Sequence, residues 1–110
     1  MIYDNEREIV GILLDYMKKN NISNKNKEKI YNMVLKIDYK TNLQKERFIR
    51  YYGLKPKEFK RETMSKIARE SNITPNAIRS SIVTIRHALV HISDEDFLIL
   101  KHIYKTELKK

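Results

Sequence analysis

Four polar side chains in a stretch of nine residues have the types that hydrogen-bond to the edges of nucleic-acid bases: Asn76, Arg79, Ser80 and Thr84. Arginine presents a fork of N–H donors that fits guanine, asparagine fits adenine, and serine or threonine bonds to a base edge or a phosphate. No Asp or Glu occurs from residue 71 to residue 92, although the first turn of a solvated helix usually welcomes acids. We therefore predict that these four side chains read the bases of a nucleic acid.

Positive charge is concentrated in the same part of the chain. The net charge is +9, and residues 40–92 account for +8 of it, with twelve Lys or Arg against four Asp or Glu. Such a local excess is the usual electrostatic footprint of a polyanionic partner. Contacts to phosphates set affinity and register without reading sequence. We predict such contacts for Lys60, Arg61, Thr63, Lys66, Arg69, Ser81 and Arg86.

Other patterns that could support chemistry are weaker. His87 and His91 are four residues apart and could share a metal ion, but the third ligand would have to be His102 or an acid of the last helix, and the chain has no cysteine. The acids at 94–96 are consecutive, so they share no helical face and form no catalytic pair. We expect no metal, no cofactor and no enzymatic activity.

Two helices joined by a tight turn are predicted to position the base-reading residues. Thr63 can cap the first helix, and Asn72 tolerates the left-handed conformation that reverses the chain. Thr74 can cap the second helix, and Pro75 suits its first position, where a missing N–H costs nothing. Ala68 is small enough to let the helices cross closely. The inward ridge of the second helix is predicted to be Ile78, Ile82, Ile85 and Leu89.

The rest of the chain also has helical spacing of apolar residues, over 5–20, 24–37, 42–53 and 93–108. We therefore predict an all-α fold of about six helices, with flanking helices before and after the helix-turn-helix core. The expected single domain, 1–110, comprises an N-terminal helical part (1–41), the helix-turn-helix part (42–92) and a C-terminal helix (93–110).

Two of these helices carry more detailed expectations. Asp4 or Asn5 should cap the first helix, whose inward face should include Ile12. Asn42 should cap the third helix, which should end at Gly53 in a left-handed conformation. On that third helix we expect Leu43 to face inward and Lys45, Arg47 and Arg50 to face outward.

Composition limits the class of protein. The chain of 110 residues is 41% hydrophobic and 34% charged, as in a globular domain with a core, and it has only 2 Gly and 2 Pro, which favours helices. No signal sequence and no apolar run near ~18 residues is visible, so we expect a cytoplasmic, nucleoid-associated protein and no membrane contact. Lys, Asn and Ile supply 40 of the 110 residues, which suggests an AT-rich genome such as that of a low-GC bacterium or a mobile element.

About half of the chain resembles region 4 of the bacterial sigma factors, the domain that reads the upstream element of promoters. The stretch ERFIRYYGL resembles the helix of that family that ends in an Arg-aromatic-Gly-Leu pattern. TMSKIARESNITPNAIRSSIVTIRHAL resembles its helix-turn-helix without a gap. Where this chain has Pro75 and Asn76, the family often has charged residues. The matching positions are Ile67, Ala68, Ile73, Thr74, Ile78, Arg79 and Leu89.

The resemblance implies a sequence-specific double-stranded DNA-binding transcription regulator, with helix 75–91 in the major groove. It leaves two alternatives open. One is a module that binds RNA polymerase or a partner factor, as part of a split sigma factor or as an antagonist. The other is a DNA-structural protein of a plasmid or phage. Because two recognition helices one DNA turn apart usually need a dimer, a homodimer through 1–39 or 93–108 is a further expectation.

Overall fold

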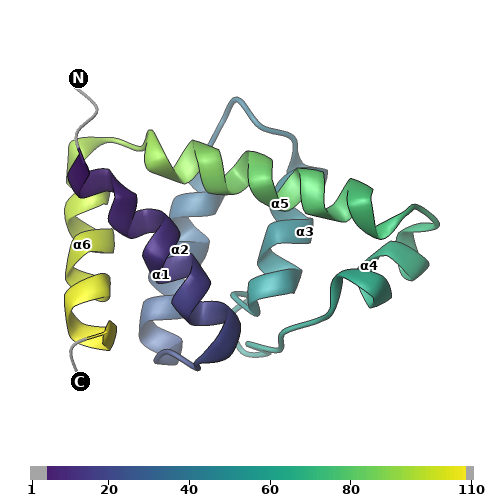
Figure 1. Cartoon of the computed structure of the whole chain (residues 1–110), viewed down its shortest axis with the longest axis horizontal. Helices are drawn as coiled ribbons and strands as arrows, with labels where there is room; N and C mark the ends of the chain where they lie inside the picture. Colours follow the sequence, from purple (N-terminus) through teal and green to yellow (C-terminus); the bar gives the residue numbers. More distant parts are fainter. Residues whose placement is uncertain (1–4, 109–110) are drawn as a thin grey trace.

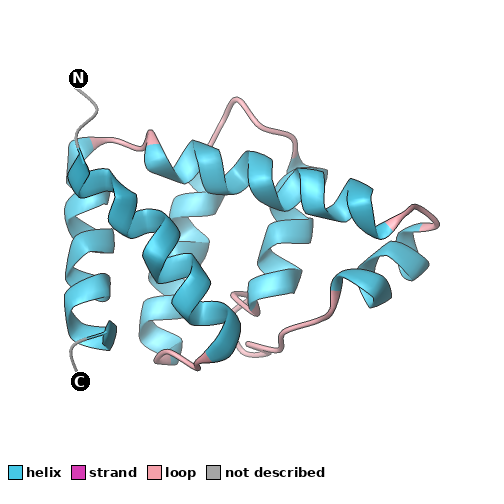
Figure 2. Ribbon diagram, in the orientation of Figure 1, coloured by secondary structure: helices cyan, strands magenta, loops and turns pink. Residues whose placement is uncertain are grey.

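The structure, a computed structural model, describes residues 5–108 (Figure 2). Within this range the chain forms a short 3-10 helix and six α-helices and has no strand, which confirms the predicted all-α fold. The elements are η1 (Asn5–Glu8), α1 (Ile9–Lys19), α2 (Asn24–Lys36), α3 (Asn42–Tyr52), α4 (Met64–Ser71), α5 (Pro75–Val90) and α6 (Asp94–Leu108).

The local signals of the helix-turn-helix are confirmed. The hydroxyls of Thr63 and Thr74 each accept a hydrogen bond from the backbone N–H three residues further on, and so they cap α4 and α5. Asn72 takes the left-handed conformation with φ 55°, and Pro75 is the first residue of α5. Gly53 ends α3 with φ 68°. A side chain at Gly53 would be strained, because an added Cβ would lie 2.9 Å from the backbone nitrogen of Arg61.

The first helix differs from the prediction at its start and along one face. Of the two predicted caps, Asp4 lies outside the described residues, and Asn5 opens the 3-10 helix instead. The cap position of α1 makes no side-chain hydrogen bond. Ile12, predicted to face inward, is 47% exposed. The inward face is formed by the residues at positions 10, 13, 14 and 17, which all belong to one side of a helix.

The third helix buries Phe48, Ile49 and Tyr52 as predicted but differs from the prediction in its first turns. Thr41 caps it in place of Asn42, and a capping box forms in which Gln44 bonds back to the backbone of Thr41 at 3.3 Å. Leu43, predicted inward, is 53% exposed. Lys45, predicted outward, is buried, and its Nζ donates to a backbone carbonyl near the end of α2 at 3.3 Å. The buried positions 45, 48, 49 and 52 form one helical face, and a lysine occupies the first of them.

Helix α5 runs along the long axis of the molecule and connects its two ends (Figure 1). α3 and α4 pack against α5, and α1 and α2 contact it as well, while α6 packs on α1 and α2. In Figure 1, α4 and the start of α5 lie at the end of the molecule farthest from α6. Buried apolar side chains from all six helices belong to one cluster. The core therefore fixes α5 along its length and leaves its N-terminal end at the periphery.

A buried arginine joins the N-terminal segment to the other end of α5. Arg7 donates to the backbone carbonyls of Val90 at 3.0 Å and Ile92 at 2.7 Å, and to the carboxylate of Asp94 at 2.5 Å. Its guanidinium also lies over the ring of Phe97, 4.6 Å from the centroid. The last carbonyls of a helix have no partners within the helix, so Arg7 satisfies groups that the junction between α5 and α6 would otherwise bury without a bond.

The apolar stripes of α1 and α6 pack against each other within one chain. Their buried residues include Leu13 and Met17 on α1 and Leu100 and Ile103 on α6. The buried carboxylate of Glu107 accepts hydrogen bonds from the start of α2, at 3.0 Å and 2.6 Å. The homodimer remains a prediction, but the two stripes on which it rested are occupied inside the protein.

Candidate nucleic-acid interface

The turn between α4 and α5 is fixed by both backbone and core. The Ile73 N–H donates to the carbonyl of Ala68 at 3.0 Å, and Ile73 packs its side chain against the core. Ala68 is buried where α4 crosses α5, and Ile78 buries the start of α5. The direction of α5 relative to α4 therefore depends on several independent contacts. A rigid turn of this kind holds the side chains that follow it in a defined orientation.

The first turns of α5 present the predicted base-reading residues to solvent. Asn76, Arg79 and Ser80 are exposed, and their side chains form no hydrogen bond or ion pair with any residue in the described range. Thr84 lies further along the helix and is half-buried. Val83 adds an exposed apolar side chain to the same part of the helix. Three of the four side chains are thus exposed and make no polar contact within the described range, and the fourth is half-buried.

Two of the predicted phosphate contacts need correction. Ser81 is only 4% exposed, and its hydroxyl donates to the carbonyl of Ala77 at 3.3 Å, because position 81 lies on the inward side of α5. Arg86 turns toward α1, where it bonds to the carboxylate of Asp15 at 2.9 Å. That hydrogen bond lowers the pKa of Asp15 below its ordinary value. Both side chains are therefore used in packing α5 against its neighbours.

The other five predicted phosphate contacts lie on α4 or in the segment just before it. Lys60 and Arg69 are exposed, and their side chains have no hydrogen-bonding or ionic partner among residues 5–108. Thr63 is exposed and caps α4. Arg61 is also exposed, but it donates to two carbonyls at the end of α1, and Lys66 pairs with a carboxylate at 3.4 Å. The side chains of Lys60 and Arg69 are therefore available to bind an anion, while those of Arg61 and Lys66 already make contacts within the protein.

Sequence reasoning placed Arg47 in solvent, but the structure brings it to α5. Arg47 is half-buried, and its Nη1 donates to the hydroxyl of Ser81 at 2.9 Å. One signal in the sequence could have found this contact. Ser81 lies three residues after Ile78 and four before Ile85, both on the inward ridge, and a serine in such a position needs a polar partner from the helix packed against it.

A cluster of charges holds α3 against α4. Arg50 on α3 forms two hydrogen bonds to the carboxylate of Glu62, at 2.8 Å and 2.9 Å, and it also pairs with Glu70 at the end of α4. Glu62 is 16% exposed and also pairs with Lys66. The bond from Arg50 lowers the pKa of Glu62 to about 2, although partial burial opposes this shift. Glu62 in turn raises the pKa of Arg50.

We expect Glu62→Gln to lower the free energy of unfolding at neutral pH. In this variant the free energy of unfolding should also fall less as the pH is lowered. A carboxylate whose pKa is depressed on folding stabilises the protein above its unfolded pKa, and this contribution is lost as the pH falls through the folded value of about 2. At neutral pH we expect a loss of ~1–2 kcal/mol. Urea unfolding at several pH values measures both effects. Glu58→Gln is the control, because Glu58 forms an exposed pair with Lys55 at 3.1 Å. Equal effects of the two variants would contradict the role of Glu62.

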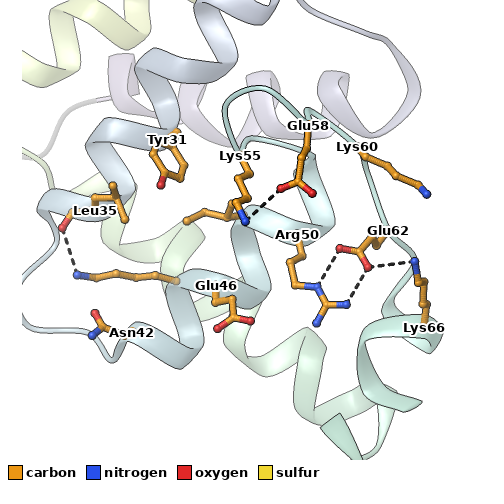
Figure 3. Close-up of a pocket in the computed structure, with 12 residues that line it drawn as sticks. Tyr31, Leu35, Asn42, Glu46, Arg50, Lys55, Glu58, Lys60, Glu62 and Lys66 are labelled. Carbon is orange, nitrogen blue, oxygen red and sulfur yellow. Dashed lines mark hydrogen bonds and ion pairs between the residues drawn. The ribbon is translucent and has the colours of Figure 1, made fainter. Parts of the chain in front are cut away.

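A groove with a volume of about 570 Å³ lies between α2, α3 and the segment that leads to α4 (Figure 3). Tyr31, Leu35 and Ile49 line it together with charged residues. Figure 3 shows Glu62 between Arg50 and Lys66 at one side of the groove. The side chains of Lys60 and Lys66, both predicted to contact phosphates, also line this groove.

His87 on α5 and His91, directly after that helix, belong to no potential metal-binding group of the described residues. The rings of His87 and His91 lie edge to face with centroids 4.8 Å apart. Within the described range, no three His, Cys, Asp or Glu side chains are grouped so that they could hold a metal ion. Among the helices of the same range, none combines the length and apolar character needed to cross a bilayer.

No protein-family model, no curated protein and no solved structure matches the chain. The resemblance to sigma region 4 therefore rests on the quoted residues and stays a prediction. The candidate site rests on the exposure, bonding and charge of its side chains.

Proposed function

We propose that the protein binds double-stranded DNA sequence-specifically, as a transcription regulator of the sigma-region-4-like type, with α5 in the major groove. One observation carries the proposal. The first turns of α5 present Asn76, Arg79 and Ser80, all exposed and with side chains that have no partner among residues 5–108, in a stretch that lacks acidic residues. These side chains are donors and acceptors that suit base edges, and an α-helix fits the major groove. The N-terminal residues of a recognition helix are the ones that contact bases.

The charges near α4 support the same arrangement. Lys60 and Arg69 are exposed cations without intramolecular partners among the described residues, and Thr63 lies at the helix N-terminus between them in sequence. Cations and hydroxyls beside a recognition helix are the groups that bind the phosphates along a groove. Their expected contribution is to affinity and register, while α5 supplies sequence preference.

Selection of duplexes from a random pool, followed by fluorescence anisotropy, tests the proposal. We expect one sequence family to be enriched. For that duplex we expect the affinity to fall at least about a hundredfold between about 50 and 200 mM salt, as for about four phosphate contacts. A scrambled duplex should bind more weakly at every salt concentration. No binding to any duplex at low salt would refute the proposal.

A second candidate function is binding to RNA polymerase or a partner factor. The groove between α2 and α3 favours it, because Leu35 is exposed at the groove and Tyr31 and Ile49 also line it. Apolar side chains grouped at one concave surface are a feature of protein-interaction sites. Co-purification of polymerase without any duplex shift at low salt would favour this function over DNA binding. A shift that is abolished by changes on α5 would favour DNA binding.

A further inference from the structure

We propose that Arg47 on α3 is an additional contact to the DNA backbone, positioned beside α5 by Ser81. This inference rests on the proposed function and extends it to a third helix. Nη1 of Arg47 donates to the Ser81 hydroxyl at 2.9 Å, and that hydroxyl donates to the carbonyl of Ala77 at 3.3 Å. The guanidinium is thus fixed relative to the backbone of α5. An arginine held in this way loses less conformational entropy when it binds an anion.

The electrostatic environment of Arg47 differs from that of the other arginines removed from solvent. Arg7, Arg50 and Arg86 are buried or half-buried, and each forms an ion pair with a carboxylate. Arg47 is half-buried as well, but it forms no ion pair with a residue in the described part of the chain, and its buried Nε has no hydrogen-bond partner there. A guanidinium that is partly removed from water is costly without a counter-charge. An anion from a partner would supply that charge.

The location of Arg47 identifies the anion as a phosphate of the bound duplex. Ser81 lies three residues before Thr84, so Arg47 contacts α5 beside one of the predicted base-reading residues. A helix with its side chains is ~10–12 Å across and the major groove is about 12 Å wide, so each flank of the helix lies close to a phosphate strand. The fork of N–H donors on arginine matches phosphate geometry.

Titration of binding against salt tests this contact, with the selected duplex and a scrambled duplex as probes. For Arg47→Gln we expect a loss of affinity of about five- to tenfold on both duplexes. We also expect the slope of log affinity against log salt to become shallower by about 1, as for the loss of one phosphate contact. Arg47→Lys keeps the charge and should retain the slope. Ser81→Ala should retain the slope and weaken binding by only about two- to threefold, because the arginine remains but is less ordered.

Lys105→Gln is the matched control, because it removes one exposed positive charge from α6. This helix lies at the opposite end of the long axis of the molecule from α4 (Figure 1). Lys105→Gln should leave the slope unchanged. An unchanged slope in Arg47→Gln, with normal binding by the wild type, would refute the contact and leave the proposed function intact. A loss confined to the selected duplex would also refute it, since Arg47 would then read a base. Failure of the wild type to bind any duplex would refute the proposed function itself.

Discussion

Arg79→Ala is expected to weaken binding to the selected duplex by about ten- to a hundredfold, which corresponds to the ~1–3 kcal/mol of one bidentate contact between arginine and guanine. Arg79 is exposed in the second turn of α5, and its side chain has no hydrogen bond or ion pair within the described structure. Replacing it therefore breaks no polar contact among the described residues. The free energy of unfolding should change by less than ~0.5 kcal/mol, as for other exposed substitutions. Loss of binding can then be assigned to the interface.

The ratio between specific and nonspecific binding decides the role of Arg79. If Arg79 reads a base, the affinity for a scrambled duplex should fall by only about two- to fivefold, the effect of one lost positive charge. Arg69→Ala is the matched variant, since Arg69 is also exposed and uncommitted but lies on α4. Arg69→Ala should lower the affinity for the selected duplex and for the scrambled duplex by the same factor. Anisotropy on the two duplexes gives both ratios. Equal losses in Arg79→Ala would assign Arg79 to a phosphate instead.

Local chemistry made the helix-turn-helix predictable. The caps at Thr63 and Thr74 and the left-handed turn at Asn72 each depend on the residue itself and on the backbone within three positions. No distant part of the chain has to be known for them. The exposure of the proposed base-reading residues was predictable for a related reason: when the inward ridge of α5 is known, the opposite positions must face solvent. Asn76, Arg79 and Ser80 follow that rule.

The directions of long side chains were not predictable, because they depend on the helix that packs alongside. Arg86 has an outward helical position, but α1 crosses α5 at Gly11, where an added Cβ would lie 2.8 Å from an Arg86 nitrogen. This close approach brings Asp15 to Arg86. Arg47 is turned inward in the same way by Ser81. Periodicity gives the angle of a side chain around its own helix and says nothing about the charges on the next helix.

The position of α5 itself depends on the buried Arg7, and Arg7→Met is expected to lower the free energy of unfolding by about 3 kcal/mol. Methionine retains an apolar chain that can pack near Phe97, but it leaves the carbonyls of Val90 and Ile92 without a charged donor. Hydrogen bonds to charged groups contribute ~1.5–3 kcal/mol each, and a buried acceptor left unpaired adds a cost. In a domain of this size the melting temperature should fall by about 10–20 °C.

Lys101→Met provides the control for this last effect, because Lys101 also connects the N-terminal segment to α6, through an ion pair with Glu6. That pair is partly exposed, and surface pairs contribute only ~0–1 kcal/mol. Urea unfolding of both variants should therefore give a loss at least about threefold larger for Arg7→Met. Equal and small losses would mean that Arg7 does not fix the end of α5. The start of α5 is held independently by the turn after α4 and by α3, so Arg7→Met should keep its duplex preference at temperatures where it is folded.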